Sequence, residues 1–368
     1  MVYEITGSGA LLGAVMGARA IPMVLLTPVS GMAADRYDRR RLMQASQGLA
    51  AAVSLAFGAA LALDMVSLWM LFAFTMLMGA SNVMDRPARF TTALELVPRE
   101  LAVNAVALNT IGFSLARVVG PAVAGYIIAA LGGAGSFFLQ GVLYAASGLM
   151  VLAVAFPRRA PRKTERSALG DMVEGLRYAV TDPRTRVLMV VGALPFFLLI
   201  PVIGTLYPIY AKDEFAAGPA GLGLLLTAVG VGGTLGGFIA NALARVERQG
   251  ALQSVWVVVM AAAIVGVAMS PSLPVAIVFS VIGGAAEMAH ASSNMAMLQI
   301  SAPEAMRGRI SSLLMLNPAF ISMGAFIAGP LSDIVGVRNA SMILGSVAIA
   351  TIAALYLLSP VLRELRHQ

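Results

Sequence analysis

The sequence contains no cysteine and little charge. Among its 368 residues, the absence of Cys excludes disulfide bonds, thiolate metal sites and cysteine nucleophiles. Charged side chains make up 12% of the chain, whereas soluble domains carry about 25%. Hydrophobic residues reach 59%, and the mean hydropathy is +0.86. Together these values exclude a soluble globular protein and indicate a protein embedded in the lipid bilayer.

Signatures of nucleotide-dependent and metal-dependent enzymes are also missing. The glycine-rich stretch 230–236 lies inside an apolar run and lacks the Lys-Ser/Thr pair of a phosphate-binding loop. The chain has two histidines, His290 and His367, too few for the repeated Glu-x-x-His motif of a di-metal bundle. We therefore expect no enzymatic activity, no cofactor and no bound metal.

Long apolar runs recur along the whole chain. A helix crosses the hydrocarbon layer with about 20 residues, at about 1.5 Å per residue. The runs are continuous rather than alternating, which favours helices over a barrel and predicts an all-α membrane protein. The eleven predicted spans are 8–34, 42–62, 67–84, 103–131, 136–156, 187–209, 219–243, 251–269, 272–297, 310–331 and 339–358.

Basic residues predict the orientation. Of the 25 Lys and Arg, 21 lie in loops on one side of this topology and two, Lys212 and Arg338, on the other. Short cytoplasmic loops retain basic residues, so the first side is predicted to be cytoplasmic. That side includes the C-terminus. We expect a multi-pass protein of the inner (plasma) membrane.

A long polar stretch, residues 157–186, divides the chain into two halves. We predict that it is a cytoplasmic linker between an N-terminal half-bundle of five spans, residues 1–156, and a C-terminal half-bundle of six, residues 187–368. Apolar residues recur at helical spacing from Leu169 to Val180, which is typical of an amphipathic helix on the membrane surface. A regulatory lipid site in the linker is the alternative.

The halves share a motif that points to a known family. The pattern G-x-x-x-(D/N)-x-x-x-R occurs at 31–39 and again at 237–245, which indicates an internal repeat of the kind found in secondary transporters. The longer stretch Gly31–Arg41 resembles the signature G-x-L-A-D-R-x-x-R-R/K, found in loop 2–3 of the major facilitator superfamily. The resemblance implies two half-bundles of the major-facilitator type.

Further stretches resemble the exporters of that superfamily. Its drug/proton antiporters carry a glycine-proline pattern in the fifth helix, and the stretches 19–22 and 303–309 resemble the branch with macrolide-efflux-like proteins and the enterobactin exporter. The superfamily has twelve helices, and this chain starts where the loop before the second would lie, so we expect the first family helix to be absent. The residues that match the glycine-proline pattern, a predicted helix kink, are Gly112, Gly120, Pro121 and Gly125.

The loop signature implies a conformational latch at the cytoplasmic face. A carboxylate there accepts hydrogen bonds from a facing helix N-terminus and pairs with arginine. We expect Asp85, at the end of its span, to extend a charge chain from Asp35 and Arg39. The alternative is that the arginines only mark topology. The residues of this predicted cytoplasmic latch are Gly31, Asp35, Arg36, Arg39, Arg40 and Asp85.

Five polar residues fall deep inside predicted spans. Arg19 and Arg117 are charges near mid-membrane, where a lone cation is costly, so we expect both to face a central cavity. Arginines held by backbone carbonyls within one half are the alternative. Glu287 and His290 lie three residues apart on one helix, and Asn294 extends the same stripe. Such residues are typical of proton pathways, so we interpret the stripe as a proton-coupling or substrate site. A buried structural pair and half of a metal site are the alternatives.

These observations favour a secondary transporter. We expect it to export a small amphipathic compound, drug-like or siderophore-like, by proton antiport, with two half-bundles that alternate in access. The expected partners are a small-molecule substrate, protons and the lipid bilayer, with no nucleic acid, and the expected state is a monomer. The rival hypothesis is a truncated remnant or a membrane interaction protein that transports nothing.

Overall fold

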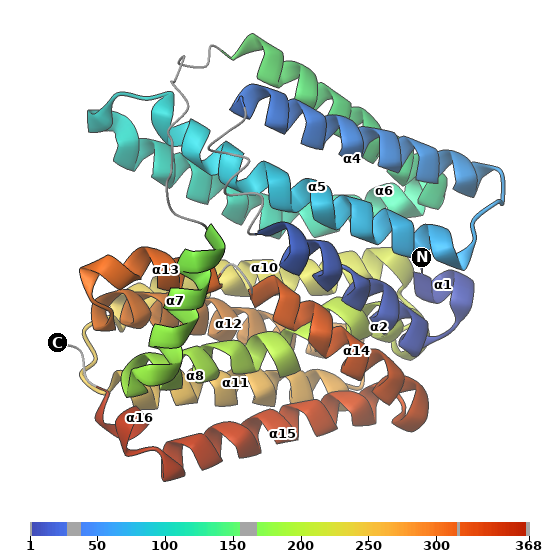
Figure 1. Ribbon diagram of the computed structural model, residues 1–368. Coiled ribbons are helices and arrows are strands. Elements are labelled where there is room, and N and C mark those ends of the chain that lie inside the picture. Colours follow the sequence, from blue (N-terminus) through green and yellow to red (C-terminus); the bar gives the residue numbers. More distant parts are fainter. Residues whose placement is uncertain (1, 28–37, 155–167, 315–316, 366–368) are drawn as a thin grey trace. The chain divides into compact units, whose positions relative to one another are not determined.

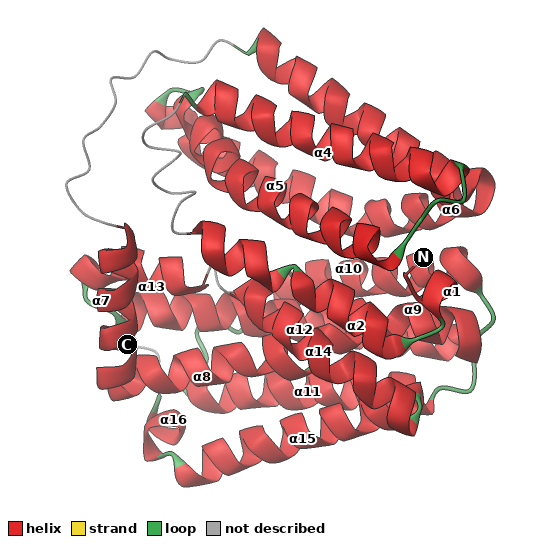
Figure 2. Ribbon diagram, turned by 45° about the vertical axis from the view of Figure 1, so that its right-hand side comes forward, coloured by secondary structure: helices red, strands yellow, loops and turns green. Residues whose placement is uncertain are grey.

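The computed structural model describes residues 2–27, 38–154, 168–314 and 317–365. Figure 1 labels the main helices in chain order, and the regular structure drawn for these ranges in Figure 2 is helical. Within them, ten helices are long and apolar enough to span a membrane. The prediction of an all-α membrane protein is confirmed.

The ten helices account for the eleven predicted spans because one helix, α6, covers two of the predicted spans. Helix α6, Ala102–Ala153, has 52 residues and would be about 78 Å long if straight, against a hydrocarbon layer of about 30 Å. Its backbone is non-helical at Gly132, with φ 70° and ψ −179°. Glycine takes a positive φ without steric strain, so the chain changes direction there and α6 supplies two crossings.

The described residues form two compact units. The first contains Ala18–Ala116 and Ile127–Gly170, and the second contains Val2–Gly17, Arg117–Tyr126 and Asp171–Gln368. Helix α6 therefore contributes to both.

The first unit is built from α4, α5 and most of α6. Helix α4, Arg39–Ala62, begins at Asp38, whose side chain accepts a hydrogen bond from the backbone N–H of Arg40. Phe57 of α4, Phe74 of α5 and Phe137 of α6 pack together with ring centroids 4.8–5.1 Å apart. The remaining bounds are Leu68–Glu95 for α5 and Arg99–Leu101 for a short 3-10 turn.

The second unit holds the larger hydrophobic core, which includes Leu188, Met260, Ile264 and Leu298. Tyr207 and Tyr210 are buried and bond to Ser280 and Ser341 across 3.0 Å. The helices with residues in this unit are α1 (Val2–Thr6), α2 (Gly9–Ala18), α7 (Ala168–Thr181), α8 (Pro183–Leu198), α9 (Tyr207–Ile209), α10 (Gly218–Ala242), α11 (Gln249–Met269), α12 (Leu273–Ser301), α13 (Glu304–Leu314), α14 (Asn317–Val335), α15 (Val337–Leu358) and α16 (Pro360–Glu364), with π-helical turns at Val202–Leu206 and Tyr210–Glu214.

Glycines set the helix spacing in this unit. A Cβ on Gly232 or Gly236 of α10 would overlap the carbonyl oxygens of Val281 and Ala285 on α12, and a Cβ on Gly284 would overlap that of Val229. The two helices are therefore in backbone contact, as small residues allow between membrane helices. This contact fixes the register of α12, which carries Glu287, His290 and Asn294.

Candidate membrane-embedded ion pair

Arg117 and Glu287 form an ion pair inside the second unit. Nη2 of Arg117 on α6 donates to Oε1 of Glu287 on α12 across 2.7 Å. The Glu287 side chain is 15% exposed and that of Arg117 is 35% exposed. Both residues lie in candidate membrane spans, where an unpaired charge is costly, so the pairing offsets much of the desolvation of each.

Helix α10 positions the arginine. A Cβ on Gly230 would overlap the carbonyl oxygen of Arg117, so the two backbones touch at this level. A Cβ on Gly233, one turn further along, would lie 3.5 Å from Cζ of Arg117. The glycines of α10 thus bring the α6 backbone close and leave room for its guanidinium, which reaches the carboxylate on α12.

The histidine and asparagine of the predicted stripe have other surroundings. Nδ2 of Asn294 donates to the carbonyl of Leu188 on α8 across 3.0 Å. His290 is 2% exposed, and its ring lies beside the backbone of Val191 and Gln253. Neither ring nitrogen makes a hydrogen bond of good geometry within the described part of the chain. The structure therefore brings Glu287 to Arg117, whereas His290 and Asn294 lie in the interior of the second unit.

Arg19 belongs to the first unit, whereas Arg117 and Glu287 belong to the second. It is exposed at the turn that follows α2, and a Cβ on Gly79 of α5 would lie 3.2 Å from its Cγ. The predicted deep arginines thus differ in their surroundings, one against α5 and one against α10 and α12.

Part of the predicted cytoplasmic latch lies outside the described residues, namely Gly31, Asp35 and Arg36. Arg39 is the first residue of α4, and Nη2 of Arg40 donates to the carbonyl of Leu152. Asp85 accepts hydrogen bonds from Nε2 of Gln47 across 3.1 Å and from Nε of Arg89 across 2.9 Å. Sequence reasoning missed both of these partners, although the i,i+4 spacing of Asp85 and Arg89 is a signal that predicts such a pair.

The glycine-proline pattern serves mainly as a packing surface. Gly125 approaches α10 so closely that a Cβ would lie 2.6 Å from the carbonyl oxygen of Pro219, and a Cβ on Gly223 would lie 2.6 Å from that of Pro121. Gly112 and Gly120 have open space around the Cβ position. Pro121 lies within α6, and the non-helical residue of that helix is Gly132.

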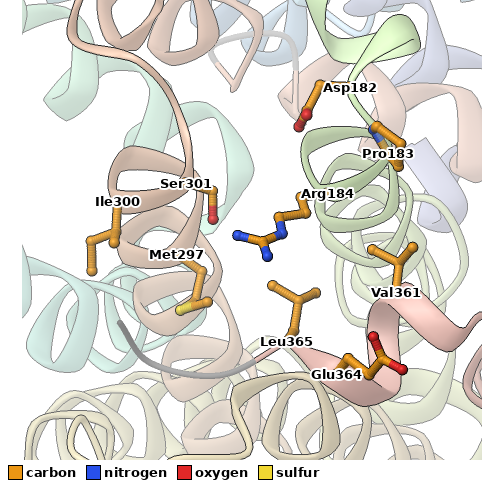
Figure 3. Close-up of a pocket in the computed structure, with 9 residues that line it drawn as sticks. All are labelled: Asp182, Pro183, Arg184, Met297, Ile300, Ser301, Val361, Glu364 and Leu365. Carbon is orange, nitrogen blue, oxygen red and sulfur yellow. The ribbon is translucent and has the colours of Figure 1, made fainter.

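A cavity of about 440 Å³ lies elsewhere in the second unit. It opens between the start of α8, the end of α12 and α16, with the Arg184 side chain directed into it (Figure 3). None of the residues predicted to form a site lines it. Its lining residues are Asp182, Pro183, Arg184, Met297, Ile300, Ser301, Val361, Glu364 and Leu365.

Comparison with known families decides the class. The family described as "Transmembrane secretion effector" matches residues 1–367. The chain belongs to this family. The resemblance to the major facilitator superfamily is thereby confirmed, and the protein is a multi-pass membrane transporter.

Individual relatives agree with the transmembrane secretion effector family. The chain is 28% identical to the multidrug efflux pump Tap of Mycolicibacterium fortuitum, over 99% of this chain and 91% of that protein. It is 26% identical to the enterobactin exporter EntS of Escherichia coli O9:H4, over 92% of this chain and 80% of that protein. Its fold is similar to that of a bacterial homolog of the human lysosomal transporter Spinster, with a TM-score of 0.77 and 16% identity, over 98% of this chain and 91% of that one.

Proposed function

We propose that this transporter exports a small amphipathic compound across the inner membrane by alternating access, and that proton entry drives the export. The observation that carries the proposal is the ion pair between Arg117 and Glu287 in membrane-spanning helices. Support for export comes from the family and from the names of the relatives, a multidrug efflux pump and a siderophore exporter. Glu287 is the proposed proton carrier.

In this pair, proton binding to Glu287 would require the guanidinium of Arg117 to find another partner. When Glu287 is ionised, its charge and that of Arg117 cancel. A proton on Glu287 removes its negative charge and leaves the Arg117 cation uncompensated in a medium of low dielectric, which is unfavourable unless water or a substrate oxygen solvates the guanidinium. Proton binding and ion pairing therefore favour different conformations, which is what coupling of a proton to transport requires.

Orientation is part of the proposal. Arg245 and Arg248 follow α10, Arg307 and Arg309 lie in α13, and Arg363 lies in α16. The bias of short loops toward basic residues supports a cytoplasmic location for these segments and for the C-terminus. Gly9 of α2 and Gly336, before α15, then lie toward the outer face.

The direct test is Glu287→Gln in proteoliposomes with an acidic lumen, using a fluorescent lipophilic cation and a siderophore as separate probes. The amide cannot carry the proton, so we expect loss of accumulation driven by the pH gradient. Exchange of probe between the two sides should remain, because it needs no net proton movement. Glu247→Gln is the matched control, since Glu247 is exposed in the loop after α10.

Two results would overturn the proposal. Full gradient-driven accumulation by Glu287→Gln would show that another group carries the proton. A parent protein that accumulates neither probe would favour the rival hypothesis of a non-transporting membrane protein.

A further inference from the structure

The N-terminus of α2 is held by a carboxylate from α14. Oδ1 of Asp333 accepts the backbone N–H of Gly9 across 2.6 Å, and Oδ2 accepts that of Ala10 across 2.9 Å. The hydroxyl of Ser8 donates to Oδ2 across 2.8 Å. Asp333 therefore makes three hydrogen bonds to consecutive residues that are more than 320 positions away in sequence.

These bonds satisfy groups that a helix cannot satisfy by itself. The first backbone N–H groups of an α-helix have no partner within it, and the helix dipole places partial positive charge there. Ser8 caps α2 locally, because its Oγ accepts the N–H of Leu11 across 3.2 Å. Asp333 supplies the remaining acceptors together with a full negative charge, and hydrogen bonds to an ionised group are roughly twice as strong as neutral ones.

Next to this carboxylate, α2 and α14 approach each other closely at glycine positions. A Cβ on Gly13 of α2 would overlap the carbonyl oxygen of Ala325 on α14, and a Cβ on Gly329 would overlap that of Gly9. Near the carboxylate the helices thus touch through backbone atoms, and further along α2 the ring of Phe326 on α14 lies over Gly17. Few side chains next to Asp333 therefore have to be withdrawn when this end of the helices separates.

A second contact fixes the segment before α2. The hydroxyl of Tyr3 in α1 donates to Oδ2 of Asp213 across 2.5 Å, and Nζ of Lys212 lies 5.1 Å from the centre of the Tyr3 ring. Burial, with the hydrogen bond to Asp213, raises the pKa of Tyr3 to about 12. The hydroxyl therefore remains a donor at physiological pH, and α1 is anchored independently of Asp333.

We infer that Asp333 is an outer latch, a residue that keeps α2 against α14 and must release it before the transporter opens to the outside. The inference rests on the proposed alternating access and orientation. Residues Val2–Gly17 belong to the second unit and Ala18–Ala116 to the first, so the C-terminal end of α2 is one of the points at which the chain passes from one unit to the other. Asp333 holds the N-terminal end of the same helix, and a single carboxylate there is a discrete contact that can be made or lost.

The test measures access to the surface beneath the latch. Leu12 of α2 is 3% exposed, and the chain has no native Cys, so Leu12→Cys introduces the only thiol. In the full chain in nanodiscs, we expect Asp333→Asn to raise the rate of labelling by a membrane-impermeant maleimide about 10-fold, equivalent to about 1.4 kcal/mol. Asp64→Asn is the control, because Asp64 is exposed after α4 and its positive φ suits Asn as well.

Two further variants keep the test decisive if Asp333→Asn fails to insert. Ser8→Ala removes one of the three hydrogen bonds to Asp333, together with the local cap on Leu11, and leaves the other two in place, so it should raise labelling less. Gly13→Ala forces the two backbones apart and should raise it strongly, whereas Gly48→Ala, with open space around its Cβ, should not. Labelling at the parent rate in Asp333→Asn, with faster labelling in Gly13→Ala, would overturn the assignment to Asp333. Because no substrate or gradient is used, the result is independent of the Glu287 experiment.

Discussion

At the scale of residues, Arg117 and Glu287 each account for the presence of the other's charge in a membrane span. Either charge alone in a membrane span would be costly, and the 2.7 Å contact relieves both. The partial exposure of the pair lets water screen it, so its net contribution to stability is smaller than that of a fully buried pair.

Removing one partner should therefore be worse than removing both. We expect Arg117→Gln to destabilise the protein by about 1–3 kcal/mol, because it leaves Glu287 without its cation. The double variant Arg117→Gln/Glu287→Gln should recover most of this loss without recovering coupling. Thermal unfolding in detergent measures the difference, and equal stability of the single and double variants would contradict the pairing.

Sequence alone predicted the depth of these two residues but not their pairing. Counting from the ends of the apolar runs locates Arg117 and Glu287 inside the membrane. Their contact depends on how α6 and α12 pack against α10. That register is fixed by close backbone contacts at Gly230 and Gly236, where a Cβ would not fit. Helical periodicity also assigned Glu287 and His290 to one face, whereas the neighbours of each helix decide which partner each side chain meets.

At the scale of elements, two consecutive glycines of α10 have opposite surroundings. A Cβ on Gly236 would overlap Ala285 of α12, whereas a Cβ on Gly237 would have only Cγ of Met288, 4.0 Å away. One residue fixes a helix contact, and its neighbour lies on an open face.

Alanine at these two positions should have opposite effects. We expect Gly236→Ala to destabilise the protein by about 1–3 kcal/mol through overpacking, since α12 must move. Gly237→Ala should be neutral or stabilising by up to about 1 kcal/mol, because alanine is the better helix former. Unfolding temperatures of the two purified variants test this, and a comparable loss in both would argue against the α10–α12 contact.

Hydropathy located the spanning elements and the break between the two parts of α6, but it did not separate α13 from α14. The predicted spans 103–131 and 136–156 are the two parts of α6, and the span 310–331 corresponds to α13 followed by α14. The kink at Gly120 and Pro121 stays a prediction, and the residue of α6 with a non-helical backbone is Gly132. Apolar length is a property of one segment, whereas a bend depends on what the segment packs against.

At the scale of the molecule, the two compact units do not follow chain order. Segments Val2–Gly17 and Arg117–Tyr126 pack with Asp171–Gln368 rather than with their neighbours in sequence. The half-bundles 1–156 and 187–368, joined by the linker 157–186, remain a prediction about architecture. In that stretch, α7 is tied to α13 by Arg309 and Glu174, whose N and O atoms are 2.6 Å apart.

Topology is testable with two single cysteines. Ala216, before α10, and Glu247, after it, are both exposed and lie at opposite ends of one spanning helix. We expect Ala216→Cys to react with an impermeant thiol reagent in intact cells and Glu247→Cys to react only after permeabilisation. Reaction of both from the same side would contradict the spanning assignment of α10, and the reverse pattern would invert the orientation.

The turn at Gly132 also bears on how the chain enters the bilayer during synthesis. Residues 131–136 contain no charged side chain, so nothing strongly hydrated has to be carried through hydrocarbon when this turn crosses. Because the connection between the two apolar segments is so short, the first segment cannot span the bilayer for long while the second remains outside it. We therefore expect the two parts of α6 to enter the bilayer together as a helical hairpin.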